Sequence, residues 1–299
     1  MSFNLSGLSA YTNENSGILV SKAVLGADLM NYITVRPGYA SGTVSINVLN
    51  TDTTGFQDAT CGWNAGGTGT AFTQIDVTVR SKEWKESLCP EDLRSYWLSM
   101  ELNPSGFAES VPFEQLIADS KIAQVKKYAE TLMGTDLISA ATVANGCALQ
   151  SGATAAAWTA SNAIDQANNL INALPSRVLA ETDLTMFMSY ASFRALTQAL
   201  AAINYFHYPV GPNVTGSGLG QSVIIPGTNV KAIPVAGFGS SNRVICGPAS
   251  KIIAVVGLTD DLDTMKIWYS VDNDEVRTMC KFRVGIGLLA DHFSTNNLA

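Results

Sequence analysis

The sequence predicts an α+β fold in which a long β-ribbon packs on a long helix and a separate α/β block is inserted between them. Three observations support this prediction. Residues 275–288 alternate between apolar and polar side chains, residues 113–133 carry an apolar stripe at helical spacing, and the intervening segment is rich in small residues and short apolar runs. Because the helix and the ribbon are far apart in the chain, we expect one domain interrupted by another.

The ribbon is predicted near the C-terminus. It opens with an aromatic strand at 267–269 and turns at 272–274, where the sequence Asp-Asn-Asp favours a turn. One face of the second strand carries Val276, Thr278, Cys280, Phe282, Val284, Ile286 and Leu288. The other face carries Glu275, Arg277, Lys281 and Arg283. At ~3.3 Å per residue this strand is about 45 Å long, so its apolar face needs an equally long partner.

That partner is predicted to be a helix over residues 113–133. Its apolar stripe consists of Phe113, Leu116, Ile117, Val125, Tyr128, Ala129 and Leu132. Pro112 suits the first helical turn, and Gly134 suits the position just past the helix end. A helix of this length spans roughly 30 Å and matches the ribbon.

The inserted block is predicted over residues 136–257. Ser161 can cap a helix that ends near Leu174. Residues 184–188 are expected to form a buried strand and residues 192–205 a second helix. Short strands are expected at 223–225, 230–235, 244–246 and 252–256. Alternating helices and strands of this kind indicate a separate α/β subdomain.

Residues 1–35 are predicted to be an extended N-terminal arm. The segment is rich in Ser and Asn and holds scattered apolar residues without a clear period. It is either an ordinary frayed terminus or an arm that lies along the same or a neighbouring subunit. For the second alternative the candidate contact residues are Phe3, Leu5 and Leu8.

Residues 43–80 are predicted to form one extended hairpin. Two alternating strands flank a Gly- and Thr-rich loop at 50–71, which is long for a compact domain and is therefore expected to protrude or to be functional. Phe56 and Trp63 in this loop are candidate inter-subunit contacts, although Trp63 has the alternative of packing within its own loop. A short helix is expected at 90–101.

Composition limits the function classes. The chain has 299 residues, is 46% hydrophobic and only 14% charged, and carries a formal net charge of −7. So few charges indicate either a surface covered by other chains or an Ala- and Gly-rich monomer. The negative charge argues against a protein that binds nucleic acid over its whole surface. The five cysteines are widely spaced and are expected to be free and mostly buried, in a reducing compartment.

No catalytic, cofactor-binding or metal-binding motif is visible in the sequence. His207 and His292 fall in different predicted subdomains, and no nucleophile motif, P-loop or zinc motif is present. The acidic residues at 260–263 fit a solvated turn better than a cation site. No apolar run reaches the eighteen residues of a membrane span. We therefore expect neither an enzyme, nor a cofactor, nor a membrane partner.

The order of these parts resembles the major capsid proteins of tailed phages, which have the Hong Kong 97-type fold. The stretches most similar to that family, and especially to its relatives in crAss-like phages, are 242–258 and KIWYSVDNDEVR at 266–277. Further similar stretches are MFMS at 186–189 with FRAL at 193–196, NYFHY at 204–208 and LCPEDL at 88–93. Together they cover about half of the chain.

The resemblance implies five parts. These are an N-terminal arm at 1–35, an E-loop hairpin at 36–85, a first P-domain part with the spine helix at 86–135, an A-domain at 136–257 and a second P-domain part with the long ribbon at 258–299. It also implies a non-enzymatic structural protein of the virion capsid, assembled in the host cytoplasm from hexamers and pentamers into an icosahedral shell.

The implied partners are copies of the same chain, packaged double-stranded DNA bound weakly and without sequence preference, and separate scaffolding, portal and decoration proteins. Some members of the family begin with a long scaffolding segment, whereas the arm here begins at Met1. Some crosslink subunits through a loop lysine, whereas residues 39–78 contain no lysine. An encapsulin-type compartment shell, which shares the fold, and a soluble metabolic enzyme are the alternatives.

Overall fold

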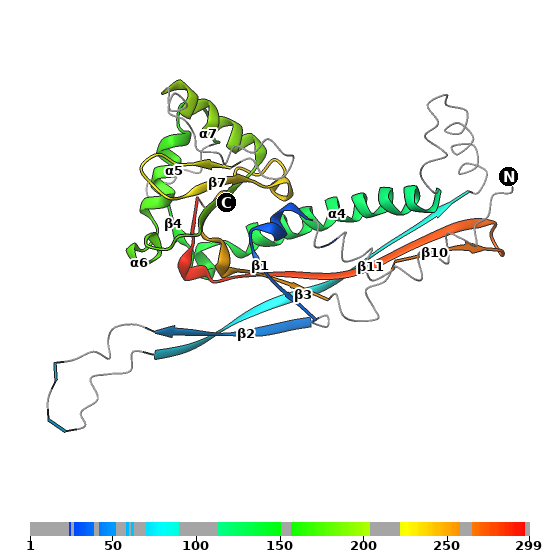
Figure 1. The fold of residues 1–299 in the computed structure, drawn as a ribbon, viewed down its shortest axis with the longest axis horizontal. Coiled ribbons are helices and arrows are strands. Elements are labelled where there is room, and N and C mark those ends of the chain that lie inside the picture. Colours follow the sequence, from blue (N-terminus) through cyan, green and yellow to red (C-terminus); the bar gives the residue numbers. More distant parts are fainter. Residues whose placement is uncertain are drawn as a thin grey trace.

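The computed structural model describes residues 24, 27–38, 42–51, 58–59, 61–62, 70–89, 113–150, 157–203, 222–257 and 265–296. The described chain is an elongated α+β structure with two six-stranded sheets. One sheet and a long helix form an extended body, a compact α/β block sits at one end, and a hairpin projects beside that block (Figure 1). No helix in the described part of the chain combines the length and apolar character needed to cross a bilayer.

The first sheet contains the predicted ribbon. Its strands, in spatial order, are β1 (Thr34–Pro37), β9 (Ile252–Val256), β11 (Glu275–Leu288), β3 (Thr70–Leu88) and β2 (Gly42–Thr51), and β10 (Met265–Ser270) also pairs with β11. β10 and β11 are antiparallel, and Asp274 lies in the turn between them at a φ of 51°. The predicted ribbon and its turn are therefore confirmed.

Burial along β11 follows the predicted alternation only in its first part. From Val276 to Phe282 every second residue is buried, but from Phe282 onward both faces are buried. Arg283, which we expected on the charged face, is only 2% exposed. This face is covered by β3, since a Cβ on Gly285, which is on the same face as Arg283, would meet the backbone of Thr78. Gly285 therefore allows β3 to pass close to β11.

Strand β3 is longer than the hairpin predicted to end at residue 80. Residues 70–79 pair with β2, and residues 80–88 pair antiparallel with residues 276–284 of β11, whereas β9 pairs with residues 284–288 of that strand. One continuous strand of 19 residues thus belongs both to the hairpin and to the body. β11 passes from β3 to β9 at Val284, which is in register with both Arg80 and Val256.

The predicted helix is confirmed, but its predicted end is wrong. Helix α4 (Phe113–Ala140) continues through Gly134 and does not end before it. Its buried face, which includes Val125, Ala129 and Met133, packs on the ribbon. The rings of Tyr128 and Phe282 meet edge to face with their centroids 6.2 Å apart.

The second sheet forms the α/β block. Its strands, in spatial order, are β4 (Ala148–Leu149), β12 (Ser294–Thr295), β8 (Ile245–Pro248), β5 (Leu184–Met188), β7 (Lys231–Pro234) and β6 (Val223–Ile224). Its helices are α5 (Ala163–Asn172), α6 (Ser176–Leu179) and α7 (Tyr190–Ala202), and short 3-10 turns complete the block. The predicted strand at 184–188 and the two predicted helices are confirmed, but the predicted Ser161 cap is wrong, because Asn162 is the N-cap of α5 and makes no side-chain cap hydrogen bond. Ser189 caps α7 by accepting a hydrogen bond from the Ser192 amide.

Two strands pair differently from the predicted division of the chain. β9, assigned to the inserted block at 136–257, pairs with β1 and β11 in the first sheet. β12, assigned to the ribbon part at 258–299, pairs with β4 and β8 in the second sheet. An apolar run such as 252–256 identifies a buried strand but not the sheet that buries it, since both sheets offer apolar neighbours.

The N-terminal part of the described chain lies on the body. The 3-10 helix η1 (Asp28–Asn31) packs against α4, and Leu29 is fully buried there. Strand β1 then pairs in parallel with β9. Residues 28–35 of the predicted arm thus contact their own chain. Most of the predicted arm and the predicted helix at 90–101 lie outside the described residues.

Candidate assembly surface

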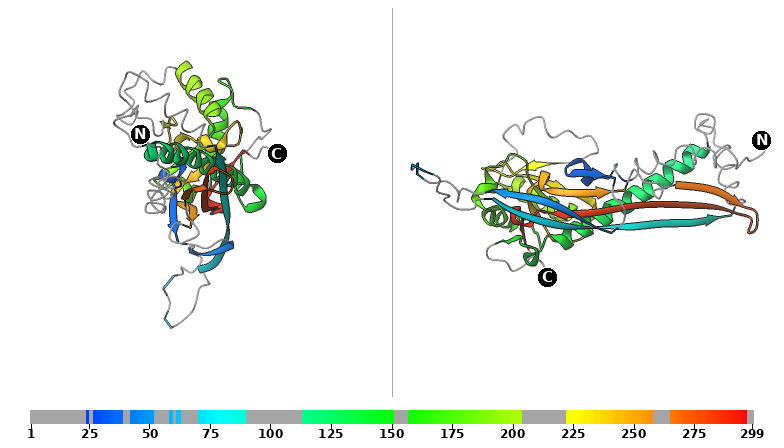
Figure 2. Two further views of the ribbon diagram at one scale, coloured as in Figure 1. Left: turned by 90° about the vertical axis from the view of Figure 1, so that its right-hand side faces the viewer. Right: turned by 90° about the horizontal axis from the view of Figure 1, so that it is seen from below.

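The hairpin of β2 and β3 projects from the body at the end opposite the turn of the ribbon (Figures 1 and 2). Its inner half is held by a small apolar core in which Ile46, Val77 and Val79 pack with Ile253 and Val255 of β9. The hairpin therefore has a rigid base, and its outer half extends beyond this core.

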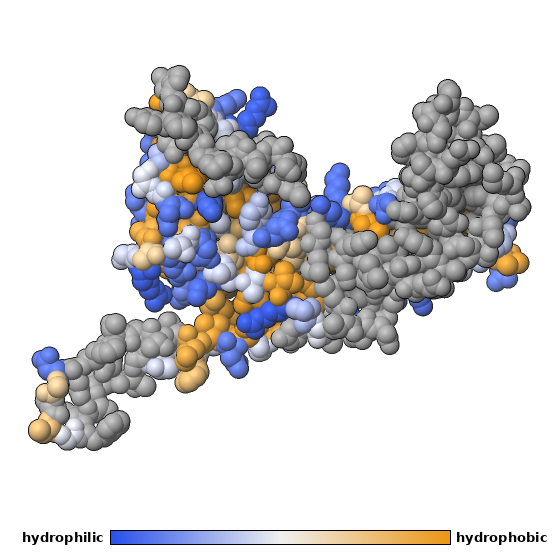
Figure 3. Space-filling view, in the orientation of Figure 1, coloured by the Kyte–Doolittle hydropathy of each residue, from blue (hydrophilic) through white to orange (hydrophobic). Residues whose placement is uncertain are grey.

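The outer half carries an exposed apolar pair. Leu49 is 61% exposed and Phe72 is 83% exposed, and the two residues are directly opposite each other in the ladder. The same face nearer the base is polar, where Ser45 donates a hydrogen bond to Asp76 at 2.6 Å. Figure 3 shows apolar surface where the hairpin leaves the body. An exposed apolar pair on a projecting polar hairpin is a candidate contact with another protein surface.

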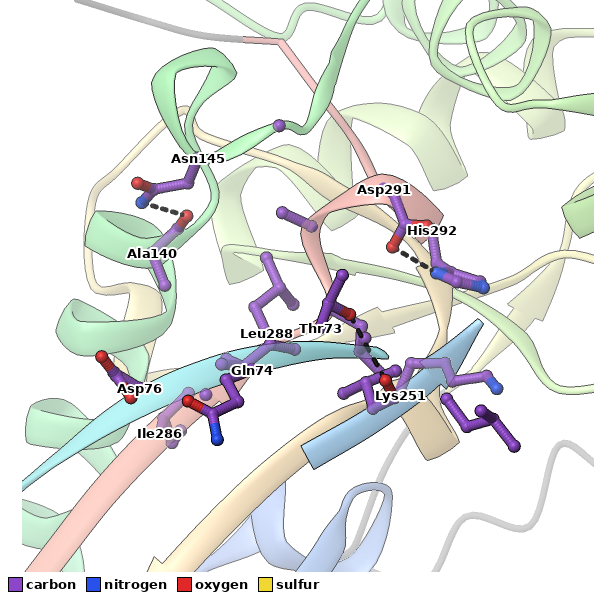
Figure 4. A pocket seen from close by; sticks show the side chains of 17 residues that line it. Thr73, Gln74, Asp76, Ala140, Asn145, Lys251, Ile286, Leu288, Asp291 and His292 are labelled. Carbon is purple, nitrogen blue, oxygen red and sulfur yellow. Dashed lines mark hydrogen bonds and ion pairs between the residues drawn. The ribbon is translucent and has the colours of Figure 1, made fainter. Parts of the chain in front are cut away.

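A cavity of about 750 Å³ lies between this hairpin and the body. Thr73 and Gln74 line it from the hairpin, Leu288 lines it from β11, and Lys251 and His292 line it from the block side (Figure 4). The cavity therefore lies on the side of the hairpin that faces the body, and Leu49 of the exposed apolar pair is one of its lining residues.

Several polar side chains that line the cavity have hydrogen-bond partners. His292 Nδ1 lies 2.6 Å from Asp291 Oδ1, and the other carboxylate oxygen of Asp291 accepts from Arg177 at 3.0 Å. At the end of α4, Asn145 donates to the Ala140 carbonyl at 2.9 Å. Among the described residues, no group of three His, Cys, Asp or Glu side chains could hold a metal ion.

A second exposed apolar patch lies at the turn of the ribbon. Val271 is 81% exposed, and Trp268 and Tyr269 of β10 are more than a third exposed. The Tyr269 hydroxyl donates to Asp274, which raises the pKa of this tyrosine. The two exposed apolar patches therefore lie at opposite ends of the molecule (Figure 2).

The structure does not describe the predicted contact residues. Phe3, Leu5, Leu8, Phe56 and Trp63 all lie outside the described residues. Sequence reasoning missed the pair described above, although a signal was present. Leu49 and Phe72 are apolar residues that fall on the polar face of an otherwise alternating hairpin.

None of the five cysteines forms a disulfide, as predicted, and three of them are buried. Burial raises the pKa of the Cys246 thiol to about 12 and that of Cys147 to about 11, the latter against the opposing effect of Arg243. A thiol is nucleophilic only as the thiolate, so these two groups are unreactive in the folded chain. Cys61 and Cys89 are exposed.

Comparisons with known proteins identify the fold. No family model and no curated protein matches the chain. Among solved structures, the chain is similar to one from the satellite phage P4 procapsid, with a TM-score of 0.56 and 12% identity over 93% of this chain and 89% of that one. It is similar to one from the capsid of a native GTA particle, with a TM-score of 0.53 and 14% identity over 92% and 88%.

A third similar structure comes from the mature capsid of bacteriophage PhiM1, with a TM-score of 0.52 and 14% identity over 91% of this chain and 88% of that one. The similarity covers nearly the whole length of each chain, so it includes the hairpin, the helix with its ribbon and the α/β block together. The chain therefore has the mixed α+β fold that is found in the capsid structures of phages and of the GTA particle.

Proposed function

We propose that this protein is a phage major capsid protein of the Hong Kong 97 type, related to those of crAss-like phages, which assembles as hexamers and pentamers into an icosahedral shell. The observation that carries the proposal is the projecting hairpin with its exposed Leu49 and Phe72, on a chain that shares its whole fold with capsid structures. An isolated two-stranded ribbon is marginal in water, so the outer hairpin gains stability when another surface covers it.

The parts of the fold take the following roles in this proposal. The hairpin of β2 and β3 is the E-loop, α4 with β10 and β11 forms the P-domain, and the second sheet with its helices forms the A-domain. The strand pairing supports moving β9 into the P-domain and β12 into the A-domain relative to the boundaries predicted from the sequence. The first 35 residues remain the proposed arm, with its inner end fastened at η1 and β1.

The hairpin of one subunit lies over the adjacent subunit of the same capsomer. Phe56 and Trp63 add to the contact made by Leu49 and Phe72, because aromatic side chains dominate interface hot spots. Residues 39–78 contain no lysine, so this loop supplies no amine for an isopeptide bond. The shell is therefore held by non-covalent burial, with separate scaffolding and portal proteins and a decoration protein as further partners. The acidic chain binds packaged double-stranded DNA weakly and without sequence preference.

The test of this function is the assembly state of the purified protein. Negative-stain microscopy and sedimentation should show shells, or rings of five or six. Shells boiled in reducing SDS should then run as single chains of 31.7 kDa. A compact monomer at all concentrations would contradict the capsid function, and a ladder of covalent oligomers would contradict the non-covalent shell.

The proposed arm is tested by deleting residues 2–20. Because the described anchor at η1 and β1 remains, the shortened chain should fold with an unchanged unfolding midpoint, but it should not form stable shells. Deletion of residues 2–20 thus separates folding from assembly. Normal shells from the shortened chain would show that the arm is an ordinary terminus.

A further inference from the structure

Glu130 is a carboxyl group buried where three elements of the molecule meet. It lies on α4, faces η1 and the 3-10 turn η4 (Ala236–Phe238), and is only 5% exposed. Its Oε2 accepts a hydrogen bond from the Leu29 amide of η1 at 3.3 Å. Its Oε1 is buried without a hydrogen-bond partner. One oxygen of this carboxyl thus connects two segments that are about a hundred residues apart, and the other has no donor.

The nearby charges do not compensate a negative charge on Glu130. Lys126 lies one turn earlier on α4, but its ammonium pairs with Asp28 of η1 at 3.3 Å. Asp28 itself presents a second negative charge to Glu130. No titratable side chain belongs to η4, whose contribution is the Gly237 amide. Within the described part of the chain, the groups around Glu130 are therefore one carboxylate, one lysine that is already paired, and backbone amides.

The environment favours the neutral form of this carboxyl. Burial raises the pKa of Glu130, the charge of Asp28 raises it further, and the hydrogen bonds from backbone amides oppose both effects without cancelling them. A neutral carboxyl tolerates one oxygen without a donor at a smaller cost than a buried carboxylate does. Ionisation would place a charge on a group of which half is without a donor.

We propose that Glu130 is a proton-controlled latch for the N-terminal segment, which in its neutral form holds η1 against α4 and on ionisation weakens this contact. The direction follows from linkage. Because the folded state retains the proton to a higher pH than the open state, the docked segment is most stable below the ordinary pKa of glutamate. Its stability falls as the pH rises through the raised pKa.

The latch controls a defined part of the chain. η1 is followed by β1, which adds to the edge of the first sheet at β9, and it is preceded by the first 27 residues. Opening at η1 therefore releases the point at which the N-terminal segment is fastened to the body. This inference concerns a single chain and does not depend on the proposed capsid function.

Hydrogen exchange of the full chain tests the latch. The measured quantity is the exchange rate of the Leu29 amide hydrogen, followed in a peptide that covers residues 27–33. Rates are divided by those of an unstructured peptide of the same sequence, which removes the intrinsic pH dependence. The range runs upward from about pH 4, below the ordinary pKa of glutamate, so that it covers the whole expected fall, and the protein is kept dilute near its isoelectric point of about 4.8. Protection in the wild-type chain should fall with rising pH, by about tenfold for each unit by which the pKa is raised.

Three variants separate the latch from a general effect of pH. Glu130→Gln keeps the shape and removes the titration, so its protection should not depend on pH. Asp28→Asn removes the negative charge next to Glu130, so the fall in protection of the Leu29 amide should move to lower pH. This variant also tests the proposal if Glu130→Gln does not fold. Asp119→Asn removes an exposed carboxylate of the same helix and should behave as the wild type. A wild-type profile without a fall, or a fall that persists unchanged in Glu130→Gln or in Asp28→Asn, would overturn the proposal.

Discussion

Gly134 of α4 and Gly237 of η4 meet backbone to backbone. A Cβ placed on Gly134 would overlap the main chain of Gly237, and a Cβ placed on Gly237 would overlap the carbonyl of Glu130. The long helix of the body and the α/β block therefore approach each other through two residues without side chains, and a Cβ on either residue would not fit between the backbones. This contact places Glu130 between the two parts, and it explains why a glycine occupies the interior of the helix.

The close contact predicts that Gly134→Ala destabilises the protein. In an exposed helix interior this change stabilises by up to about 1 kcal/mol. Here the added methyl group must displace the Gly237 backbone, so a net loss of about 1–3 kcal/mol is expected. Urea unfolding measures the difference. Thr131→Ala, at an exposed position one turn earlier, is the control and should be neutral or slightly stabilising. A stable Gly134→Ala variant would show that the two segments can separate without cost.

Replacing Phe282 measures how much the contact between ribbon and helix stabilises the protein. The residue is 2% exposed and its ring meets Tyr128 edge to face. Phe282→Ala should lower the free energy of unfolding by roughly 3–5 kcal/mol, because a large side chain leaves a closed core. Lys281→Ala, on the other face of the same strand, should change it by less than about 0.5 kcal/mol. Equal stability of the two variants would mean that the apolar face of the ribbon is open to solvent.

The exposed pair on the hairpin predicts a defect in assembly without a defect in folding. The double variant Leu49→Ser and Phe72→Ser should unfold within about 0.5 kcal/mol of the wild type, because both side chains are already in water. The same variant should fail to form the particles that the wild type forms in sedimentation. Thr73→Ala, at the next exposed position, is the matched control. Normal assembly of the double variant would exclude this pair as a contact.

The burial of the cysteines predicts how many of them a thiol reagent modifies in the folded chain. At pH 8 a soluble thiol reagent should modify the exposed Cys61 and Cys89 of the folded single chain and leave the other three cysteines unmodified. Burial removes access to Cys280, and it also raises the pKa of Cys147 and Cys246 far above this pH. All five should react in denaturant. Rapid modification of a third thiol in the folded chain would indicate local opening of a sheet.

Much of the fold could be predicted because its signals are local. The alternation along β11 and the continuous apolar run of β5 can each be recognised within a few residues, and both strands are where we expected them. The end of α4 could not be predicted in this way. Gly134 has the residue type that ends helices, but its place is set by contact with Gly237, which is 103 positions later in the chain.

The second half of β3 was missed for a different reason. Its inward positions include Lys82 and Glu86 where an amphipathic strand would carry apolar residues. These charges are matched across the structure, since Glu86 accepts from Lys121 of α4 at 2.5 Å and Lys121 lies over the Trp84 ring. A strand whose inward charged side chains are paired with a distant helix has no apolar period to detect.

The candidate contact pair on the hairpin was missed because Leu49 and Phe72 are apolar residues at polar positions of the alternation that identified the hairpin.

Strand β3 can carry a mechanical force from the hairpin to the body. It is continuous for 19 residues, or about 60 Å at ~3.3 Å per residue, and joins the hairpin ladder to the nine register pairs that it makes with β11. Hydrogen bonds in an antiparallel ladder lie perpendicular to the strands. A pull on the hairpin end of β3 therefore loads the ladder with β11 in shear, with many bonds sharing the force at once, and does not peel it open one bond at a time. Tension applied to the hairpin is carried along one covalent strand to the far end of the body.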